Sequence, residues 1–143
     1  MTTLLDVNVL IALVDGTHVH HTAAIDFFKA THANGWSTCP LTENGFLRIL
    51  GRAGTDLGPD SPASARVLLR SLISTPGHVF WPDDVTLTDT NIFPVLPPSK
   101  DLTDVYLLAL AVKHEGRFAT FDQRFAPTVV KGGMNAYFTI PVR

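Results

Sequence analysis

Residues 4–16, with the sequence LLDVNVLIALVDG, change from a strand pattern to a helix pattern within a few positions. The run over residues 2–7 is typical of a short buried strand, and from residue 8 apolar side chains recur at helical spacing until Asp15. Asp6 is therefore expected at the carboxyl end of a strand, where an open parallel sheet places its ligand crevice.

The rest of the chain continues this alternation of strands and helices. Further strands are predicted at residues 36–39, 78–81, 117–120 and 136–140. Further helices are predicted at residues 17–34, 41–50, 63–73, 88–93 and 101–115. Strands that alternate with helices predict an α/β fold with a central, mostly parallel sheet of four or five strands and helices on both faces.

Composition limits the classes of protein to consider. The chain has 143 residues, 45% of them hydrophobic, which predicts one globular domain over residues 1–143. Its single cysteine, Cys39, can form no internal disulfide, so we expect a cytoplasmic location. Asp6 and Asn8 interrupt the apolar N-terminal stretch, so we expect neither a signal peptide nor a membrane span. The net charge of -2 argues against a broad basic surface and allows a local basic groove.

Four carboxylates have distinctive positions in this pattern. Asp6 lies at the carboxyl end of the first predicted strand, and Asp122 directly follows residues 117–121, at the carboxyl edge of another. Glu43 and Asp104 each begin an apolar stripe with the spacing i, i+3, i+4, i+7 on a predicted helix. We expect all four acids to meet at one edge of the sheet.

Three of these acids also have an ordinary structural explanation. Asp6 is suited to cap a helix, Asp104 to offset a helix dipole and Asp122 to open a turn. Burial of a single carboxylate is energetically costly, and carboxylates that lie close together raise one another's pKa unless a cation compensates. Oxygen ligands without Cys or His favour Mg²⁺ or Mn²⁺ over zinc, and such ions promote the attack of water on a phosphodiester.

Four segments, taken in order, resemble PIN-domain ribonucleases, and most closely the VapC-type toxins of toxin–antitoxin modules. They are LLDVNVLIALV at 4–14, TENGFLR at 42–48, TDVYLLALA at 103–111 and ATFDQRF at 119–125. The resemblance runs from residue 3 to about residue 125. It implies a three-layer PIN-like fold and an endoribonuclease that uses Mg²⁺ or Mn²⁺ to hydrolyse RNA.

The resemblance also assigns roles to residues. It matches Asp6, Glu43, Asp104 and Asp122 to the family's acidic, metal-binding quartet. Asp6 and Asp104 are expected to be direct ligands, Glu43 a ligand either directly or through water, and Asp122 is the least determined. The remaining matches are two supporting polar residues, Asn8 and Thr120, and one arginine, Arg48, which is suited either to contact phosphate or to pair with a carboxylate. Arg48 and Arg124 are the candidate substrate-binding residues.

Partners are implied by the same resemblance. Related toxins form homodimers and are blocked at the acidic pocket by a cognate antitoxin, so we expect a homodimer and a VapB-like antitoxin. RNA is the expected substrate, and Arg66, Arg70, Lys100 and Arg124 are candidates for contacts with its backbone.

Other interpretations remain to be weighed. A haloacid-dehalogenase-type phosphatase needs a second acid two residues after the first, where this chain has Asn8. A receiver-like module needs a late lysine, and Lys131 is poorly placed for that role. A PIN-like fold that only binds proteins is the non-enzymatic alternative, against which the four intact acids argue. A zinc site built from His18, His20 and His21 lacks a fourth ligand nearby in the sequence.

Overall fold

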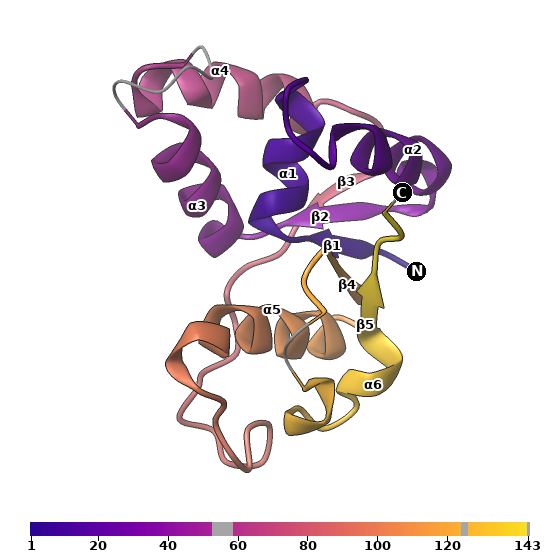
Figure 1. The fold of residues 1–143 in the computed structure, drawn as a ribbon. Helices are drawn as coiled ribbons and strands as arrows, with labels where there is room; N and C mark the ends of the chain where they lie inside the picture. Colours follow the sequence, from indigo (N-terminus) through magenta and orange to yellow (C-terminus); the bar gives the residue numbers. More distant parts are fainter. Residues whose placement is uncertain (53–58, 124–125, 143) are drawn as a thin grey trace.

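The computed structural model describes residues 1–52, 59–123 and 126–142. Within them, five strands form one sheet in the order β3-β2-β1-β4-β5, and all neighbouring strands are parallel (Figure 1). The strands are β1 (Thr3–Leu5), β2 (Trp36–Thr38), β3 (His78–Phe80), β4 (Arg117–Thr120) and β5 (Tyr137–Thr139). The predicted parallel sheet of four or five strands is confirmed.

The order of the strands places a crevice beside the first strand. The chain adds β2 and β3 on one side of β1 and then returns to the other side with β4 and β5. Such a reversal is a topological switch point, and ligands of open α/β sheets bind there, beyond the carboxyl ends of the strands. The order also differs from that of flavodoxin-like receiver modules, in which the second strand is at the edge; here β3 occupies that edge.

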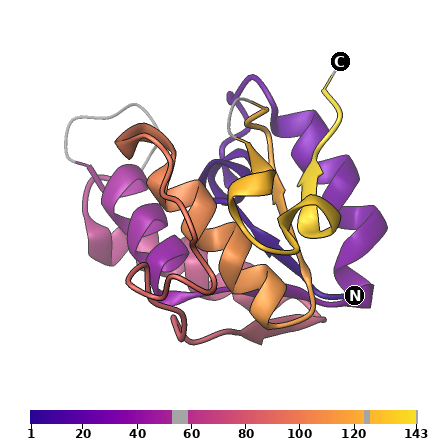
Figure 2. The same ribbon diagram turned by 90° about the horizontal axis from the view of Figure 1, so that it is seen from below.

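Helices cover both faces of the sheet. They are α1 (Val7–Val14), α2 (His21–Thr31), α3 (Pro40–Leu50), α4 (Pro62–Ile73), α5 (Leu102–Lys113) and α6 (Gly133–Ala136), with 3-10 turns η1 (His32–Asn34), η2 (Ser99–Asp101) and η3 (Pro127–Val129). Helices α1 to α4 lie on one face, and α5 and α6 lie on the other (Figures 1 and 2). The expected three layers of helix, sheet and helix are therefore present.

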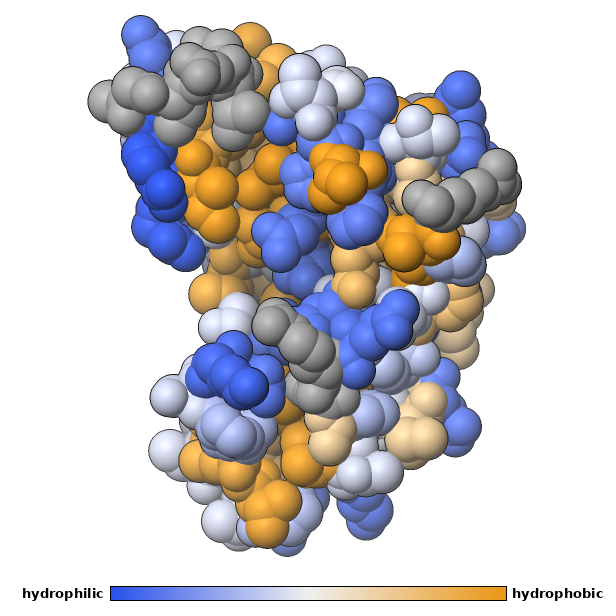
Figure 3. Space-filling view, in the orientation of Figure 1, coloured by the Kyte–Doolittle hydropathy of each residue, from blue (hydrophilic) through white to orange (hydrophobic). Residues whose placement is uncertain are grey.

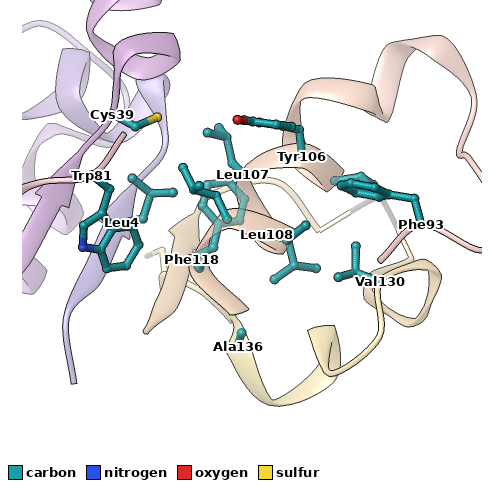
Figure 4. Packing of buried hydrophobic residues seen from close by; sticks show 14 residues of the cluster. Leu4, Cys39, Trp81, Phe93, Tyr106, Leu107, Leu108, Phe118, Val130 and Ala136 are labelled. Carbon is teal, nitrogen blue, oxygen red and sulfur yellow. The ribbon is translucent and has the colours of Figure 1, made fainter. Parts of the chain in front are cut away.

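Two apolar clusters hold these layers together. Side chains alternate between the faces of a strand, so Leu4 of β1 packs into one cluster and Leu5 into the other. In β4, Phe118 and Ala119 divide in the same way. Figure 4 shows Phe118 and Leu4 among the side chains of α5, including Leu107. Burial of both faces explains why these strands have apolar sequences instead of an apolar-polar alternation.

The structure corrects the prediction of a helix at residues 88–93, which is wrong. This segment forms turns, in which the Asp89 carboxyl accepts a hydrogen bond from the Asn91 backbone at 2.9 Å and the Thr86 hydroxyl one from Thr88 at 3.3 Å. Short polar side chains that bond the nearby backbone in this way compete with helix formation. The short helix α6, which the sequence analysis did not predict, follows Gly132 in the left-handed conformation at φ 80°.

Candidate active site

Asp6 follows β1 and caps the amino end of α1. Its Oδ1 accepts a hydrogen bond from the Val7 backbone at 2.7 Å, and its Oδ2 accepts one from the Thr120 hydroxyl at 2.7 Å. The residue is only 7% exposed. The capping role that the sequence allows is therefore present, and together with Thr120 it holds the carboxyl in one orientation at the sheet edge.

Thr120 connects the ends of β1 and β4. Its fully buried hydroxyl donates to Asp6 and accepts a hydrogen bond from the Asp122 backbone at 3.0 Å. The Tyr137 hydroxyl donates to the carbonyl of Asp122. These bonds hold the turn after β4 against β1, although Asp6 and Thr120 are 114 residues apart in the sequence.

Asp104, in the first turn of α5, faces the same edge. Burial, together with the charges of Asp6 and Asp122, raises the pKa of its carboxyl to about 7. The carboxyls of Asp104 and Asp122 are within hydrogen-bonding reach of each other. Burial also raises the pKa of Asp6, against the lowering effect of its hydrogen bonds to Thr120 and Val7. Three carboxyls thus share one site and oppose one another's ionisation.

Asp6 and Asp104 lie away from the ion pairs of the described residues. Within residues 1–52, 59–123 and 126–142, no lysine or arginine forms an ion pair with Asp6 or Asp104. The ion pairs found there join Lys113 and His114 to the surface residue Asp84. In the described part of the chain, the charges that shift the pKa values of Asp6 and Asp104 are those of other acids.

Glu43, on α3, reaches the same sheet edge from β2. Its Oε2 accepts a hydrogen bond from the Thr38 hydroxyl at 2.7 Å, and Thr38 is the fully buried last residue of β2. Because β2 and β1 are parallel neighbours, Glu43 lies at the carboxyl end of the sheet, as Asp6 does. In the described part of the chain, its hydrogen bond goes to Thr38 and not to another carboxyl.

A glycine brings α3 close to the start of α1. A Cβ added to Gly45 would lie 2.8 Å from Cγ2 of Val7 and 3.3 Å from its Cγ1. Only a residue without a side chain permits this approach. Since Val7 follows Asp6 and Gly45 is two residues after Glu43, the contact brings the helices of both acids together.

The other predicted site residues have different surroundings. Asn8 is exposed in the first turn of α1, and Arg48 is exposed on α3. Arg124 lies outside the described residues. An open cleft of about 480 Å³ includes one of the four acids, Asp122, and its lining is Asn8, His18, His20, Phe121, Asp122 and Gln123.

The histidines near this cleft have packing contacts. The ring of His20 lies 4.6 Å from that of Phe121. Nδ1 of His21 is 2.6 Å from the Ala12 carbonyl oxygen, a hydrogen bond that connects α2 to α1. Across the described ranges, no three His, Cys, Asp or Glu side chains converge closely enough to surround a metal ion by themselves.

Sequence reasoning missed three residues that belong to these surroundings. Asp101 is 8% exposed and its charge contributes to the raised pKa of Asp104. The i, i+3 spacing of these two acids was a usable signal, because such residues are neighbours on a helix. Thr38 and His78, which bond each other, gave only the weak signal of polar residues inside apolar strands.

Comparison with known proteins identifies the family. A family model for the PIN domain matches residues 3–129. The chain belongs to the PIN domain family. This confirms the resemblance drawn from the four sequence segments.

Curated members of the PIN domain family align with almost the whole chain. Ribonuclease VapC44 of Mycobacterium tuberculosis is 43% identical over 134 residues, which cover 92% of this chain and 94% of that protein. Ribonuclease VapC39 of the same organism is 42% identical, with 92% and 96% covered. Ribonuclease VapC29 is 41% identical over 126 residues, with 88% and 90% covered. This PIN domain is therefore of the VapC type.

A solved structure has the same PIN fold. It is the VapBC2 complex of Rickettsia felis bound to a DNA fragment from its promoter. The match has a TM-score of 0.60 at 10% identity and covers 87% of this chain and 91% of that one. At this identity the likeness concerns the fold alone.

Proposed function

We propose that this chain is the endoribonuclease toxin of a toxin–antitoxin module and hydrolyses RNA phosphodiester bonds with Mg²⁺ or Mn²⁺. The observation that carries the proposal is the shared site of Asp6, Asp104 and Asp122, in which burial and mutual repulsion raise the pKa of Asp104 to about 7. Such a cluster is costly to maintain for structure alone, because burial and like charges both oppose the ionisation of its carboxyls. The ribonuclease names of the relatives support the same activity.

The donor set fits a hard divalent cation. Asp6 and Asp104 would hold it, with Asp122 and Glu43 contributing directly or through water. All of these donors are oxygens, and Mg²⁺ binds proteins through one or two carboxylates while it keeps several waters. A closed cage of three or more protein ligands is therefore unnecessary. Once bound, the ion would lower the pKa of water and stabilise negative charge on the phosphoryl group.

The chain's own residues orient the reacting groups. Val7 and Thr120 fix the two oxygens of Asp6, so that its carboxyl enters the site in a single orientation. Thr38 holds Oε2 of Glu43, and we assign the other oxygen, Oε1, to bind the attacking water. Preorganisation of this kind lowers the entropy that the reaction must lose.

Partners are part of the proposal. RNA is the substrate, with Arg48 and Arg124 as candidate phosphate contacts. The antitoxin would be a VapB-like protein, since the similar Rickettsia felis protein was solved as a VapBC2 complex. Apolar surface over α3 and α4 in Figure 3 offers such a partner an area to bury, and Val67 of α4 is 67% exposed.

A homodimer, a single domain and a cytoplasmic location complete the proposal. Among the described helices, none is long and apolar enough to cross a bilayer.

Cleavage of end-labelled total RNA tests the activity. Purified antitoxin-free protein is incubated with Mg²⁺, with Mn²⁺ or with EDTA, beside the variants Asp104→Asn and Asp26→Asn. Asp26 is an exposed aspartate of α2 and serves as the matched control. We expect discrete cuts that require metal and Asp104 and that persist in Asp26→Asn. Folded protein that cuts no RNA with either metal would overturn the proposal and favour a protein-binding PIN-like module.

A further inference from the structure

The Thr38 hydroxyl has two partners on opposite sides. One is Oε2 of Glu43 at 2.7 Å, and the other is Nε2 of His78 at 2.8 Å. Thr38 is fully buried, so water does not replace either partner. His78 begins β3, the edge strand that pairs with β2. A continuous chain of hydrogen bonds therefore runs from the edge strand to an acid of the candidate site.

The number of available protons decides which group donates and which accepts in each of these two hydrogen bonds. A hydroxyl carries a single proton, and an ionised carboxyl can only accept. The Thr38 proton therefore goes to Glu43, and the Thr38 oxygen must accept from His78. Nε2 of His78 then carries a proton. If Nε2 were unprotonated, it would compete with Glu43 for the Thr38 proton. The hydroxyl would then have two orientations, one toward Glu43 and one toward His78, instead of one.

The surroundings of His78 hold its ring in place. The ring packs edge-on against Trp36 of β2, with 4.6 Å between the ring centres. Trp36 and His78 are also paired residues in the β2–β3 register. Burial lowers the pKa of His78, against the raising effect of the Glu43 charge, and so favours the neutral ring.

We propose that His78 is a positioning residue for Glu43: its Nε2–H holds the Thr38 hydroxyl in the orientation that fixes Glu43 at the acidic edge. The proposal rests on the proposed ribonuclease function, in which Glu43 binds the attacking water. Among the described residues, His78 is joined to Glu43 by hydrogen bonds through the Thr38 hydroxyl. It acts through Thr38 alone, and its removal leaves Thr38 free to turn away from Glu43.

Kinetics of RNA cleavage test this role with paired variants. In His78→Leu and Thr38→Val, kcat should fall about 10- to 100-fold, as is usual when an outer hydrogen-bond partner is lost. KM for RNA should stay unchanged. His78→Gln and Thr38→Ser, which keep a donor at each position, should retain most of kcat. The double variant His78→Leu/Thr38→Val should lose no more than either single variant, because both break the same chain.

A matched control separates positioning from folding. His32 is also partly buried and bonds the Pro76 carbonyl at 2.9 Å, close to β3 but away from Thr38. His32→Leu should keep kcat, and melting temperatures of all variants show whether they fold. The proposal is overturned if folded His78→Leu keeps the parental kcat or if His78→Gln loses as much as His78→Leu.

A second readout needs no activity. Two-bond ¹H–¹⁵N correlation spectra of the metal-free protein report which nitrogen of His78 carries the proton. We expect Nε2–H in the parent, with the signal altered in Thr38→Val. A proton on Nδ1 would overturn the proposal. Should the parent cleave no RNA, the ribonuclease function fails, while the tautomer still decides whether His78 directs Thr38.

Discussion

At the scale of single residues, the candidate site is defined by acids whose side chains are fixed by hydrogen bonds or lie close to other acids. Asp6 has both carboxyl oxygens in hydrogen bonds, and Asp104 lies in the field of three other acids, Asp6, Asp122 and Asp101. Burial destabilises the ionised forms of both acids and raises both pKa values, and in Asp6 the hydrogen bonds from Thr120 and Val7 offset part of this effect. A neutral substitution of Asp6 therefore also affects these two hydrogen bonds.

Asp104→Asn should stabilise the metal-free protein in a pH-dependent way. The pKa of Asp104 is raised from 3.8 to about 7 in the folded state, so folded protein keeps a proton that the unfolded chain releases. This group's contribution to stability is complete below about pH 4 and is lost as the pH rises through about 7. With EDTA present, the variant should melt roughly 2–6 °C above the parent at pH 8 and close to it at pH 4.5.

Thermal melts of parent, Asp104→Asn and the control Asp26→Asn at both pH values check this prediction. Asp26 is exposed, so its substitution should leave the melting temperature nearly unchanged at either pH. An Asp104→Asn gain of equal size at pH 4.5 and pH 8 would show that charge repulsion is not its cause.

At the scale of elements, the site depends on how closely α3 approaches α1. Gly45 contacts Val7 directly, and these residues neighbour Glu43 and Asp6 in the sequence. Val7 is β-branched and has little rotamer freedom in a helix, so it cannot move aside easily. The distance between the two helices is therefore controlled by one glycine.

Gly45→Ala should lower the free energy of unfolding by about 1–3 kcal/mol, the usual penalty of overpacking. The added Cβ would lie 2.8 Å from Val7 Cγ2, so α3 must shift and carry Glu43 with it. RNA cleavage should decrease too. Val7→Ala removes the contacting methyl groups, so the double variant should recover part of both losses. Urea unfolding and cleavage assays measure the two effects.

Gly16→Ala is the control for this experiment, because a Cβ there meets no atom within 4 Å. It should change stability by less than about 0.5 kcal/mol. If Gly45→Ala behaved like Gly16→Ala, the close approach of α3 and α1 would not control the site.

At the scale of the whole molecule, the strand order brings distant segments to one edge. The chain adds β2 and β3 on one side of β1 and then β4 on the other, parallel to it, so Asp6, at the end of β1, meets Thr120 and Asp122, at and beyond the end of β4. Helix α5 delivers Asp104 from the opposite layer. A cation bound there would therefore connect the two helical layers across the sheet.

Mg²⁺ or Mn²⁺ should accordingly raise the melting temperature of the parent. A ligand at 100 times its Kd adds about 2.7 kcal/mol to the stability of the folded state, which corresponds to several degrees. Asp6→Asn and Asp104→Asn should lose most of this shift, and Asp26→Asn should keep it. Differential scanning calorimetry with titrated metal measures it. An equal shift in all four proteins would place the metal elsewhere.

Much of the fold followed from local pattern. The β1–α1 transition, the strands at 36–39 and 117–120 and the periodicity of α5 were predicted, because each depends on residues close together in the chain. The helix expected at 88–93 failed because polar side chains bond the backbone there, a competition that apolar spacing does not report.

The sequence by itself determined the α/β alternation and the placement of acids at strand ends and on the first turns of helices. The family followed from the resemblance of the four ordered segments that carry those acids. Tertiary structure alone decided which acids raise one another's pKa, that Glu43 bonds Thr38, and that His78 bonds the same Thr38 hydroxyl. The physical reason is that these contacts depend on strand order and on close approach of helices. Those features arise from packing of the whole chain, and no local periodicity encodes them.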